Sequence, residues 1–132
     1  MPAKDIYHDT VKIALEKDGW TITHDTLHLP YGEKDLFVDL AAEKFVVAEK
    51  ADRKIAVEIK SFVGSSPVTD LEKALGQYIL YQDVLEEVES ERVLYLAIRQ
   101  STYKEVFCVP IGMILLKKNR LRLIVFNPKK QE

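Results

Sequence analysis

Residues 92–98 form a nearly continuous apolar run, Arg-Val-Leu-Tyr-Leu-Ala-Ile. Its length and its aliphatic and aromatic content are typical of a β-strand, and it lacks the polar and apolar alternation of a strand with one wet face. The run therefore predicts a central strand that is covered on both faces. Such a strand needs helices packed against its sheet, which favours an α/β fold.

The rest of the chain supplies the other elements of this fold. A helix is predicted over Asp5–Asp18, where Gly19 is suited to the end of a helix. A longer helix should begin after Ser66, with Pro67 in its first turn, and continue to about Glu89. Strands are predicted over 20–24, 46–50, 54–60 and 121–126, with a turn at 51–53, a loop at 27–34, and two short helical pieces within 102–118. We expect a mixed central β-sheet flanked by helices.

Composition sets the scale of this fold. The chain has 132 residues, of which 47% are hydrophobic and 30% are charged, and it predicts one domain over residues 1–132. A single cysteine, Cys108, excludes an internal disulfide, and its apolar neighbours predict a buried thiol. The longest apolar stretch, Ile111–Leu116, is too short to cross a bilayer, and the N-terminus does not resemble a signal peptide. We therefore expect a soluble cytoplasmic protein with no membrane contact.

Charges are unevenly distributed although the formal net charge is only -2. Residues 70–91 contain seven acids and one base, Lys73, whereas residues 99–130 contain eight bases and one acid, Glu105. This asymmetry is typical of a surface that meets phosphates or an acidic protein, and equally of ordinary solvated faces. The candidate DNA contacts in the basic segment are Arg99, Lys117, Lys118 and Arg122.

A candidate catalytic site lies on the strand predicted over 54–60. Side chains of a strand alternate between its faces, so Glu58 and Lys60 are neighbours on one face. Asp39 is the one polar residue in the apolar segment 36–42. An acid in such a strand is costly to desolvate, and a divalent cation shared by two carboxylates compensates that cost.

This arrangement predicts Mg²⁺, or Mn²⁺, held by Asp39, Glu58 and the backbone carbonyl of Ile59. The metal would activate water, and Lys60 would orient that water or stabilise the charge that develops on a phosphate. The expected reaction is phosphodiester hydrolysis. The structural alternative, which spacing alone leaves open, is a buried Asp39 bonded to backbone and a surface pair of Glu58 with Lys60.

Two further sets of side chains are candidates for the same site. Gln77 and Tyr81 are four residues apart and share a helix face, although the residues alone favour Tyr81 packing the helix on the sheet together with Tyr78 and Leu85. Asp9 and Glu16 of the first helix are candidates for an additional metal ligand, or are simply solvated charges.

The order Asp39, Glu58-Ile59-Lys60, then Gln77 and Tyr81 resembles the PD-(D/E)XK nuclease superfamily, and the Gln-x-x-x-Tyr spacing resembles its RecB-like branch. The whole chain resembles the XisH family, the fdxN element excision controlling factors of cyanobacteria. The segments that carry this resemblance are His8-Asp9, Ala14-Leu15-Glu16-Lys17-Asp18-Gly19-Trp20, Thr21-Ile22-Thr23-His24-Asp25, Asp35-Leu36-Phe37-Val38-Asp39-Leu40, Ala56-Val57-Glu58-Ile59-Lys60-Ser61-Phe62, Ala74-Leu75-Gly76-Gln77-Tyr78 and Leu121-Arg122-Leu123-Ile124-Val125-Phe126.

The resemblance implies a restriction-endonuclease-like fold and a role in programmed DNA excision during heterocyst differentiation. The implied partners are DNA, a site-specific recombinase and a XisI-family protein. Asp39 and Glu58 would be the metal ligands, Lys60 the catalytic lysine, and Gln77 with Tyr81 the helix residues that face the site.

Two other functions compete with this one. The first is a non-catalytic interaction subunit, whose acidic helix and basic C-terminal third bind a XisI-type partner or pair two copies as a homodimer. The second is a generic RecB-like nuclease of defence or repair. A working enzyme needs Asp39, Glu58 and Lys60 to converge around an open cavity, whereas an interaction subunit needs a large exposed apolar patch.

Overall fold

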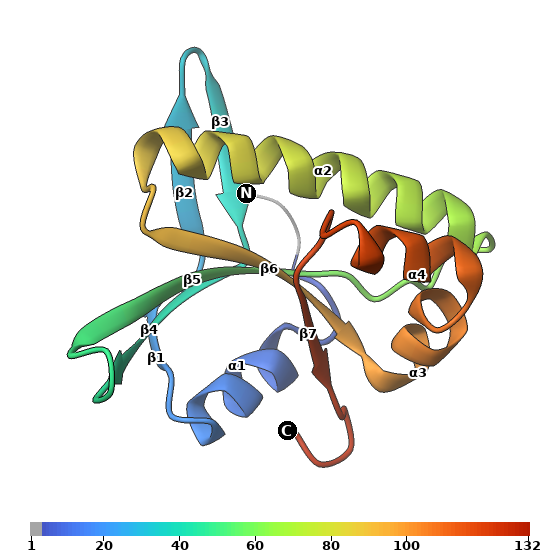
Figure 1. Ribbon diagram of the computed structural model, residues 1–132, viewed down its shortest axis with the longest axis horizontal. Coiled ribbons are helices and arrows are strands. Elements are labelled where there is room, and N and C mark those ends of the chain that lie inside the picture. The colour runs from blue at the N-terminus through green and yellow to red at the C-terminus, as the bar shows by residue number, and fades with distance from the viewer. Residues whose placement is uncertain (1–3) are drawn as a thin grey trace.

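A five-stranded mixed sheet forms the centre of the computed structural model, which describes residues 4–132 (Figure 1). The strands of this sheet are β1 (Thr21–His24), β4 (Leu40–Val46), β5 (Ala51–Ile59), β6 (Arg92–Arg99) and β7 (Leu123–Phe126), in the order β1-β4-β5-β6-β7. The first three pair antiparallel, whereas β5, β6 and β7 are parallel. The prediction of an α/β fold with a mixed sheet is therefore confirmed.

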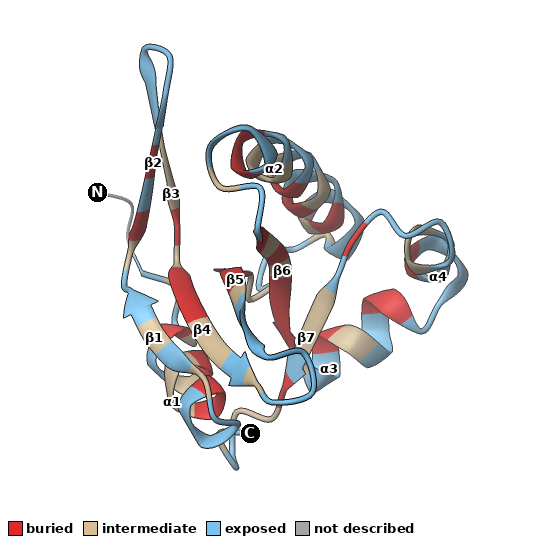
Figure 2. Cartoon of the chain, turned by 60° about the vertical axis from the view of Figure 1, so that its left-hand side comes forward, coloured by how far each residue is buried: buried red, intermediate tan, exposed pale blue. Residues whose placement is uncertain are grey.

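Helices cover both faces of this sheet (Figures 1 and 2). Helix α1 (His8–Lys17) packs on one face, and α2 (Pro67–Val88) and α4 (Pro110–Lys117) pack on the other. Two short helical pieces, α3 (Gln100–Thr102) and the π-helix η1 (Tyr103–Phe107), connect β6 to α4. None of the helices among residues 4–132 is both long enough and apolar enough to cross a membrane.

Strand β5 divides its side chains between two cores, as the period-two pattern predicts. Ile55, Val57 and Ile59 pack in the cluster beneath α1, whereas Ala56 packs in the cluster beneath α2. Glu58 alternates with Val57 and Ile59 and therefore points to the α2 side of the sheet. The strand thus carries its charged end toward the helix that holds Gln77 and Tyr81.

Helix α2 follows the capping signals of its sequence. The side-chain hydroxyl of Ser66 accepts a hydrogen bond from the backbone N–H of Thr69 at 3.2 Å, and Pro67 occupies the first turn. Its inner face buries Leu71, Ala74, Tyr78 and Leu85 against the sheet. The predicted helix from Ser66 to about Glu89 is confirmed.

The segment predicted to be a loop over 27–34 is instead part of a β-hairpin. Strands β2 (Leu27–Tyr31) and β3 (Lys34–Val38) pair antiparallel and project beyond the main sheet (Figure 1). Leu27 and Leu29 are buried while their neighbours are exposed, so the alternation was present in the sequence. Pro30 concealed it, because proline is accepted in strands only where no ladder donor is needed. Gly32, with a φ of +60°, makes the turn.

The next hairpin was predicted with the correct order and the wrong boundaries. Residues 46–50 were expected to form a strand and 51–53 a turn, but β4 ends at Val46 and β5 begins at Ala51. The strands pair from Leu40 opposite Val57 to Val46 opposite Ala51, and this buried pairing sets the register. The turn therefore falls at 47–50, where Lys50 has a φ of +52°.

Cys108 also differs from its prediction. The thiol was expected to be buried, yet Cys108 is exposed at the turn between η1 and α4. Its predecessors Val106 and Phe107 take the core positions. The helical break at Pro110 is confirmed.

Gly112 allows α4 to lie against η1 at backbone distance. A Cβ atom at this position would come within 2.0 Å of the Val106 carbonyl oxygen and 2.7 Å of the Phe107 Cα. Both neighbours are backbone atoms and cannot move aside without shifting the helix. The contact requires the absence of a side chain.

We predict that Gly112→Ala lowers the free energy of unfolding by about 1–3 kcal/mol, because the added methyl group overlaps backbone. The matched control is Gly76→Ala in α2, where an added Cβ meets no atom within 4 Å. That control should be neutral or stabilising by up to ~1 kcal/mol. Thermal unfolding followed by circular dichroism measures both, and equal melting temperatures for the two variants would contradict the expectation.

Candidate active site

Two carboxylates meet where β3 passes into β4 and where β5 ends. Asp39 lies between these first two strands, and the pairing of Leu40 with Val57 brings it beside the end of β5. The Asp39 carboxylate accepts a hydrogen bond from the backbone N–H of Ile59 at 2.7 Å, between Oδ2 and N. In return, the backbone N–H of Asp39 donates to Oε1 of Glu58 at 3.4 Å. The two strand ends are thus tied through both acids.

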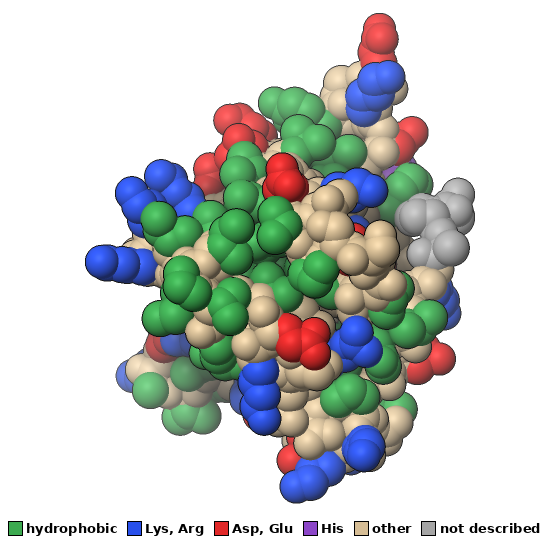
Figure 3. Space-filling model, turned by 90° about the vertical axis from the view of Figure 1, so that its right-hand side faces the viewer, with side chains coloured by type: hydrophobic (Ala, Val, Ile, Leu, Met, Phe, Trp, Pro, Cys, Tyr) green, Lys and Arg blue, Asp and Glu red, His purple; other side chains and the backbone are tan. Residues whose placement is uncertain are grey.

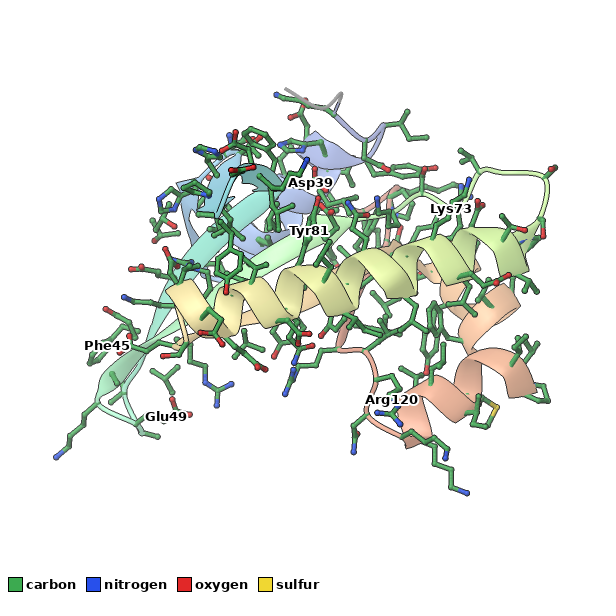
Figure 4. The ribbon with its side chains drawn as sticks, turned by 90° about the horizontal axis from the view of Figure 1, so that it is seen from above. Asp39, Phe45, Glu49, Lys73, Tyr81 and Arg120 are labelled. Carbon is green, nitrogen blue, oxygen red and sulfur yellow. The ribbon has the colours of Figure 1, made fainter. Side chains whose placement is uncertain are left out.

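A hollow of about 180 Å³ opens over this pair. The acid–acid–lysine set and the helix pair of the sequence prediction all reach it, although they come from three segments of the chain. The lining residues are Lys4, Asp5, Phe37, Asp39, Glu58, Ile59, Lys60, Gln77 and Tyr81. Figure 4 shows Asp39 and Tyr81 close together above α2. We call this cavity the acidic hollow.

Burial controls the protonation of Glu58. This side chain is only 5% exposed, and its pKa is raised from an ordinary 4.5 to about 9, with burial as the largest cause. A side-chain hydrogen bond with Asp39 and the charge of Asp39 also contribute to this raised pKa, while the charge of Lys60 opposes them. The protein alone therefore holds a proton on Glu58 at neutral pH. The pair of Asp39 and Glu58 has too little positive charge beside it to keep both carboxyl groups ionised.

This donor set suits a hard divalent cation. Mg²⁺ binds through one or two carboxylates and keeps several waters, and its positive charge is what the two acids lack. Within residues 4–132, no three side chains of the His, Cys, Asp or Glu type gather as a metal-binding group. The backbone carbonyl of Ile59 and water would therefore complete the shell around Asp39 and Glu58.

Helix α2 contributes Gln77 and Tyr81 to the lining of the acidic hollow. The side-chain amide of Gln77 donates a hydrogen bond to the Tyr81 hydroxyl at 3.0 Å, between Nε2 and Oη. Burial raises the pKa of Tyr81, and the nearby charges of Glu58 and Asp39 raise it further, so the hydroxyl stays protonated and able to donate. The ring also packs against the core beneath α2, so Tyr81 both lines the hollow and packs the helix on the sheet.

The four predicted DNA contacts do not line the acidic hollow. Arg99 donates to the Tyr7 hydroxyl at 3.0 Å and to Oγ1 of Thr102 at 3.3 Å, and its guanidinium lies over the Tyr7 ring. Lys117, Lys118 and Arg122 are exposed at the end of α4 and ahead of β7. Their role in DNA binding stays a prediction.

The predicted additional acids also lie elsewhere. Asp9 and Glu16 are exposed on α1, which covers the opposite face of the sheet from α2 (Figure 2). Asp5, which precedes α1, is the third acid at the acidic hollow, and its Oδ1 accepts a hydrogen bond from the Tyr7 backbone N–H at 2.9 Å. No pattern in the sequence distinguishes Asp5 from other acids near the N-terminus.

A second hollow of about 230 Å³ adjoins the first, since both are lined by Asp5 and Lys60. Its other walls are formed by Ser61–Gly64, Asp70, Lys73 and Ala74. Lys73 was missed as a site residue, although one signal marks it: it is the single base among the seven acids of residues 70–91. In the structure Lys73 lines the same hollow as Lys60.

Fold and site together define a mixed α/β domain with an acid–acid–lysine cluster at the end of a central strand. The sequence model of the XisH protein family matches residues 1–132. The chain belongs to the XisH family. A comparison with curated proteins finds no significant match.

Two crystal structures are similar to the chain along almost its whole length. An XisH family protein from Nostoc punctiforme PCC 73102 is 39% identical, with a TM-score of 0.86 over 96% of this chain and 94% of that one. A fdxN element excision controlling factor protein from Anabaena variabilis is 38% identical, with a TM-score of 0.85 over 97% of this chain and 95% of that one.

We predict that Glu58→Gln removes a pH-dependent loss of stability. The pKa of Glu58 is higher in the folded protein than in the unfolded chain. Its contribution to the free energy of unfolding is therefore full at pH values below its ordinary pKa of 4.5 and is lost as the pH rises toward about 9. In chelator, the melting temperature of the variant relative to wild type should rise from about pH 5 to about pH 9. Exposed Glu86→Gln on α2 is the control, and parallel profiles for all three proteins would contradict the assignment.

Proposed function

We propose that this protein is a metal-dependent DNA phosphodiesterase with a restriction-endonuclease-like fold of the PD-(D/E)XK type. The observation that carries the proposal is the convergence of Asp39, Glu58 and Lys60 on one open hollow at the end of β5. A protein with a similar structure is named for control of fdxN element excision, and excision of a DNA element requires strand exchange or cleavage. The name of this relative and the cluster therefore both support DNA as the proposed substrate.

The chain's own residues divide the work of such a reaction. Asp39 and Glu58 would hold Mg²⁺ or Mn²⁺ together with the carbonyl of Ile59, and the bound ion would supply an acidified water and charge neutralisation at the phosphate. The ammonium group of Lys60 would stabilise negative charge on the phosphate oxygens. Tyr81, oriented by Gln77, would donate a hydrogen bond to the same group. The buried strand ends keep these groups in fixed positions.

Lysines beside the two hollows suit the path of a DNA strand. Lys4 and Lys60 line the acidic hollow, and Lys73 lines the adjoining one with Lys60. Lysine neutralises phosphate charge without reading sequence, so these contacts would give salt-dependent and sequence-independent binding. Arg99, Lys117, Lys118 and Arg122 lie outside both hollows and would act only on DNA more distant from the reaction.

A non-catalytic role is the second candidate. In this alternative the chain is an interaction subunit of an excision complex, paired with a XisI-type partner beside a site-specific recombinase. The observation that favours it is the exposed apolar outer face of α4, where Ile111, Met113 and Ile114 are each about half exposed. Such a subunit needs no metal and no hydrolysis.

We predict that the protein cleaves DNA in the presence of Mg²⁺ or Mn²⁺ and that chelator stops the cleavage. Linear, supercoiled and branched DNA are the substrates, and gel electrophoresis measures the products. Glu58→Gln and Lys60→Ala should each lower the rate about a hundredfold or more. Lys54→Ala, on the same strand and outside both hollows, should leave the rate unchanged. Cleavage that survives both site substitutions, or no cleavage of any substrate, would reject the proposal.

We also predict that metal binding stabilises the fold through Asp39. A ligand that binds only the folded state adds about 2.7 kcal/mol to the free energy of unfolding at ~100 times its Kd. Mg²⁺ or Mn²⁺ should therefore raise the melting temperature of the wild type and leave that of Asp39→Asn unchanged. Glu43→Gln, an acid on neighbouring β4, is the matched control and should respond as wild type does. An equal metal response in Asp39→Asn would remove Asp39 from the ligand set.

A further inference from the structure

Helix α4 is apolar on two sides. Leu115 and Leu116 pack against the core beneath α2, as the inner face of a surface helix should. Its outer residues are also apolar: Ile111, Met113 and Ile114 are 49%, 53% and 50% exposed. A helix that is apolar all round is normally buried, so the outer face of α4 lacks a cover within the described chain.

The neighbouring flank of α2 continues this apolar surface. Ile79 and Leu80 are 47% and 53% exposed. Leu75 of α2 and Leu115 of α4 pack against the same core cluster, and both helices lie on the same side of the sheet (Figures 1 and 2). Figure 3 shows hydrophobic side chains gathered over this side of the molecule, with lysine and arginine at one margin and acids at another. We define the α2–α4 face as Ile79, Leu80, Ile111, Met113 and Ile114.

Opposite charges border the two helices of this face. Asp83 and Glu86 follow Ile79 by four and seven residues and therefore share its side of α2. Lys117 and Lys118 follow Ile114 by three and four residues at the end of α4. All four are exposed, and within residues 4–132 none of them forms an ion pair of 4 Å or less.

We propose that the α2–α4 face binds a second copy of this chain, with α4 of each protomer packed against α2 of its partner. The α2–α4 face combines exposed apolar residues with acids on α2 and with bases at the end of α4. A two-fold rotation can therefore place α2 of one protomer against α4 of the other. Ile111, Met113 and Ile114 then meet Ile79 and Leu80, and Lys117 with Lys118 meets Asp83 with Glu86. A closed dimer results, and the outer face of α4 becomes buried.

This dimer leaves the acidic hollow open. Gln77 and Tyr81 are each two residues from Ile79, which is about 200° around an α-helix, so they lie on the opposite flank of α2 from Ile79, and Leu80 lies between the two flanks. Figure 4 agrees, with Asp39 and Tyr81 on one side of α2 and Arg120 on the other. The dimer proposal therefore does not depend on the proposed enzymatic function.

Sedimentation equilibrium over a range of protein concentrations tests the proposal. We expect a reversible wild-type dimer and a dissociation constant at least about tenfold weaker in Ile114→Asp, because a carboxylate would be placed at the apolar centre. Val47→Asp is the control, since Val47 is 78% exposed in the turn between β4 and β5, away from the α2–α4 face. Far-ultraviolet circular dichroism verifies that each variant is folded.

Charge reversal then tests the arrangement of the helices. Lys117→Glu with Lys118→Glu makes both helices acidic, and Asp83→Lys with Glu86→Lys makes both basic, so each double variant alone should be monomeric. An equimolar mixture of the two should form a heterodimer, and added salt should weaken it. A wild type that stays monomeric at every concentration would overturn the proposal and assign the face to a different protein. A dimer that survives Ile114→Asp, or a mixture that does not pair, would overturn it as well.

Discussion

The hydrogen bond from the Ile59 backbone to the Asp39 carboxylate is the contact on which the site depends. It spans 2.7 Å and joins the junction of β3 and β4 to the last residue of β5. Because the donor is a backbone amide in a central strand, the position of the carboxylate is set by the sheet and not by a flexible side chain. The reciprocal bond to Glu58 fixes the second acid relative to the first. The sheet thereby holds two carboxyl groups together at a cost in desolvation.

Period-two alternation is the part of the structure that the sequence predicted best. It assigned Glu58 and Lys60 to one side of their strand, and the capping residues around Ser66 located the start of α2. Asp39 was predicted as a site residue from its isolation in an apolar segment. The interruption between strands β3 and β4 at this residue was not predicted. That interruption follows from the β2–β3 hairpin, whose alternation was concealed by Pro30. Local patterns define faces, whereas strand boundaries depend on which strand pairs with which.

The missing pieces of the site share one physical cause. Asp5 and Lys73 reach the hollows only because the N-terminal segment and α2 pass beside the end of β5, and no local pattern encodes that proximity. Arg99 fails to reach them for the same reason, since the aromatic ring and hydroxyl of Tyr7 hold it, 92 residues away in sequence. Charge density along the chain predicted a basic surface. It did not predict which bases face the acids.

The order of the strands has a consequence for how the acidic hollow is assembled. Asp39 immediately precedes β4, Glu58 belongs to its antiparallel neighbour β5, and the two acids are 19 residues apart, a short loop to close. The parallel partner β6 is separated from β5 by the whole crossover that contains the 22 residues of α2. Because contacts between residues close in sequence form more readily, the two acids would meet before α2 docks, while both are still hydrated. Docking of α2 would then remove water from the pair. The burial that contributes most to the raised pKa of Glu58 would then be completed when α2 docks, whereas Asp39 would already raise this pKa before that step.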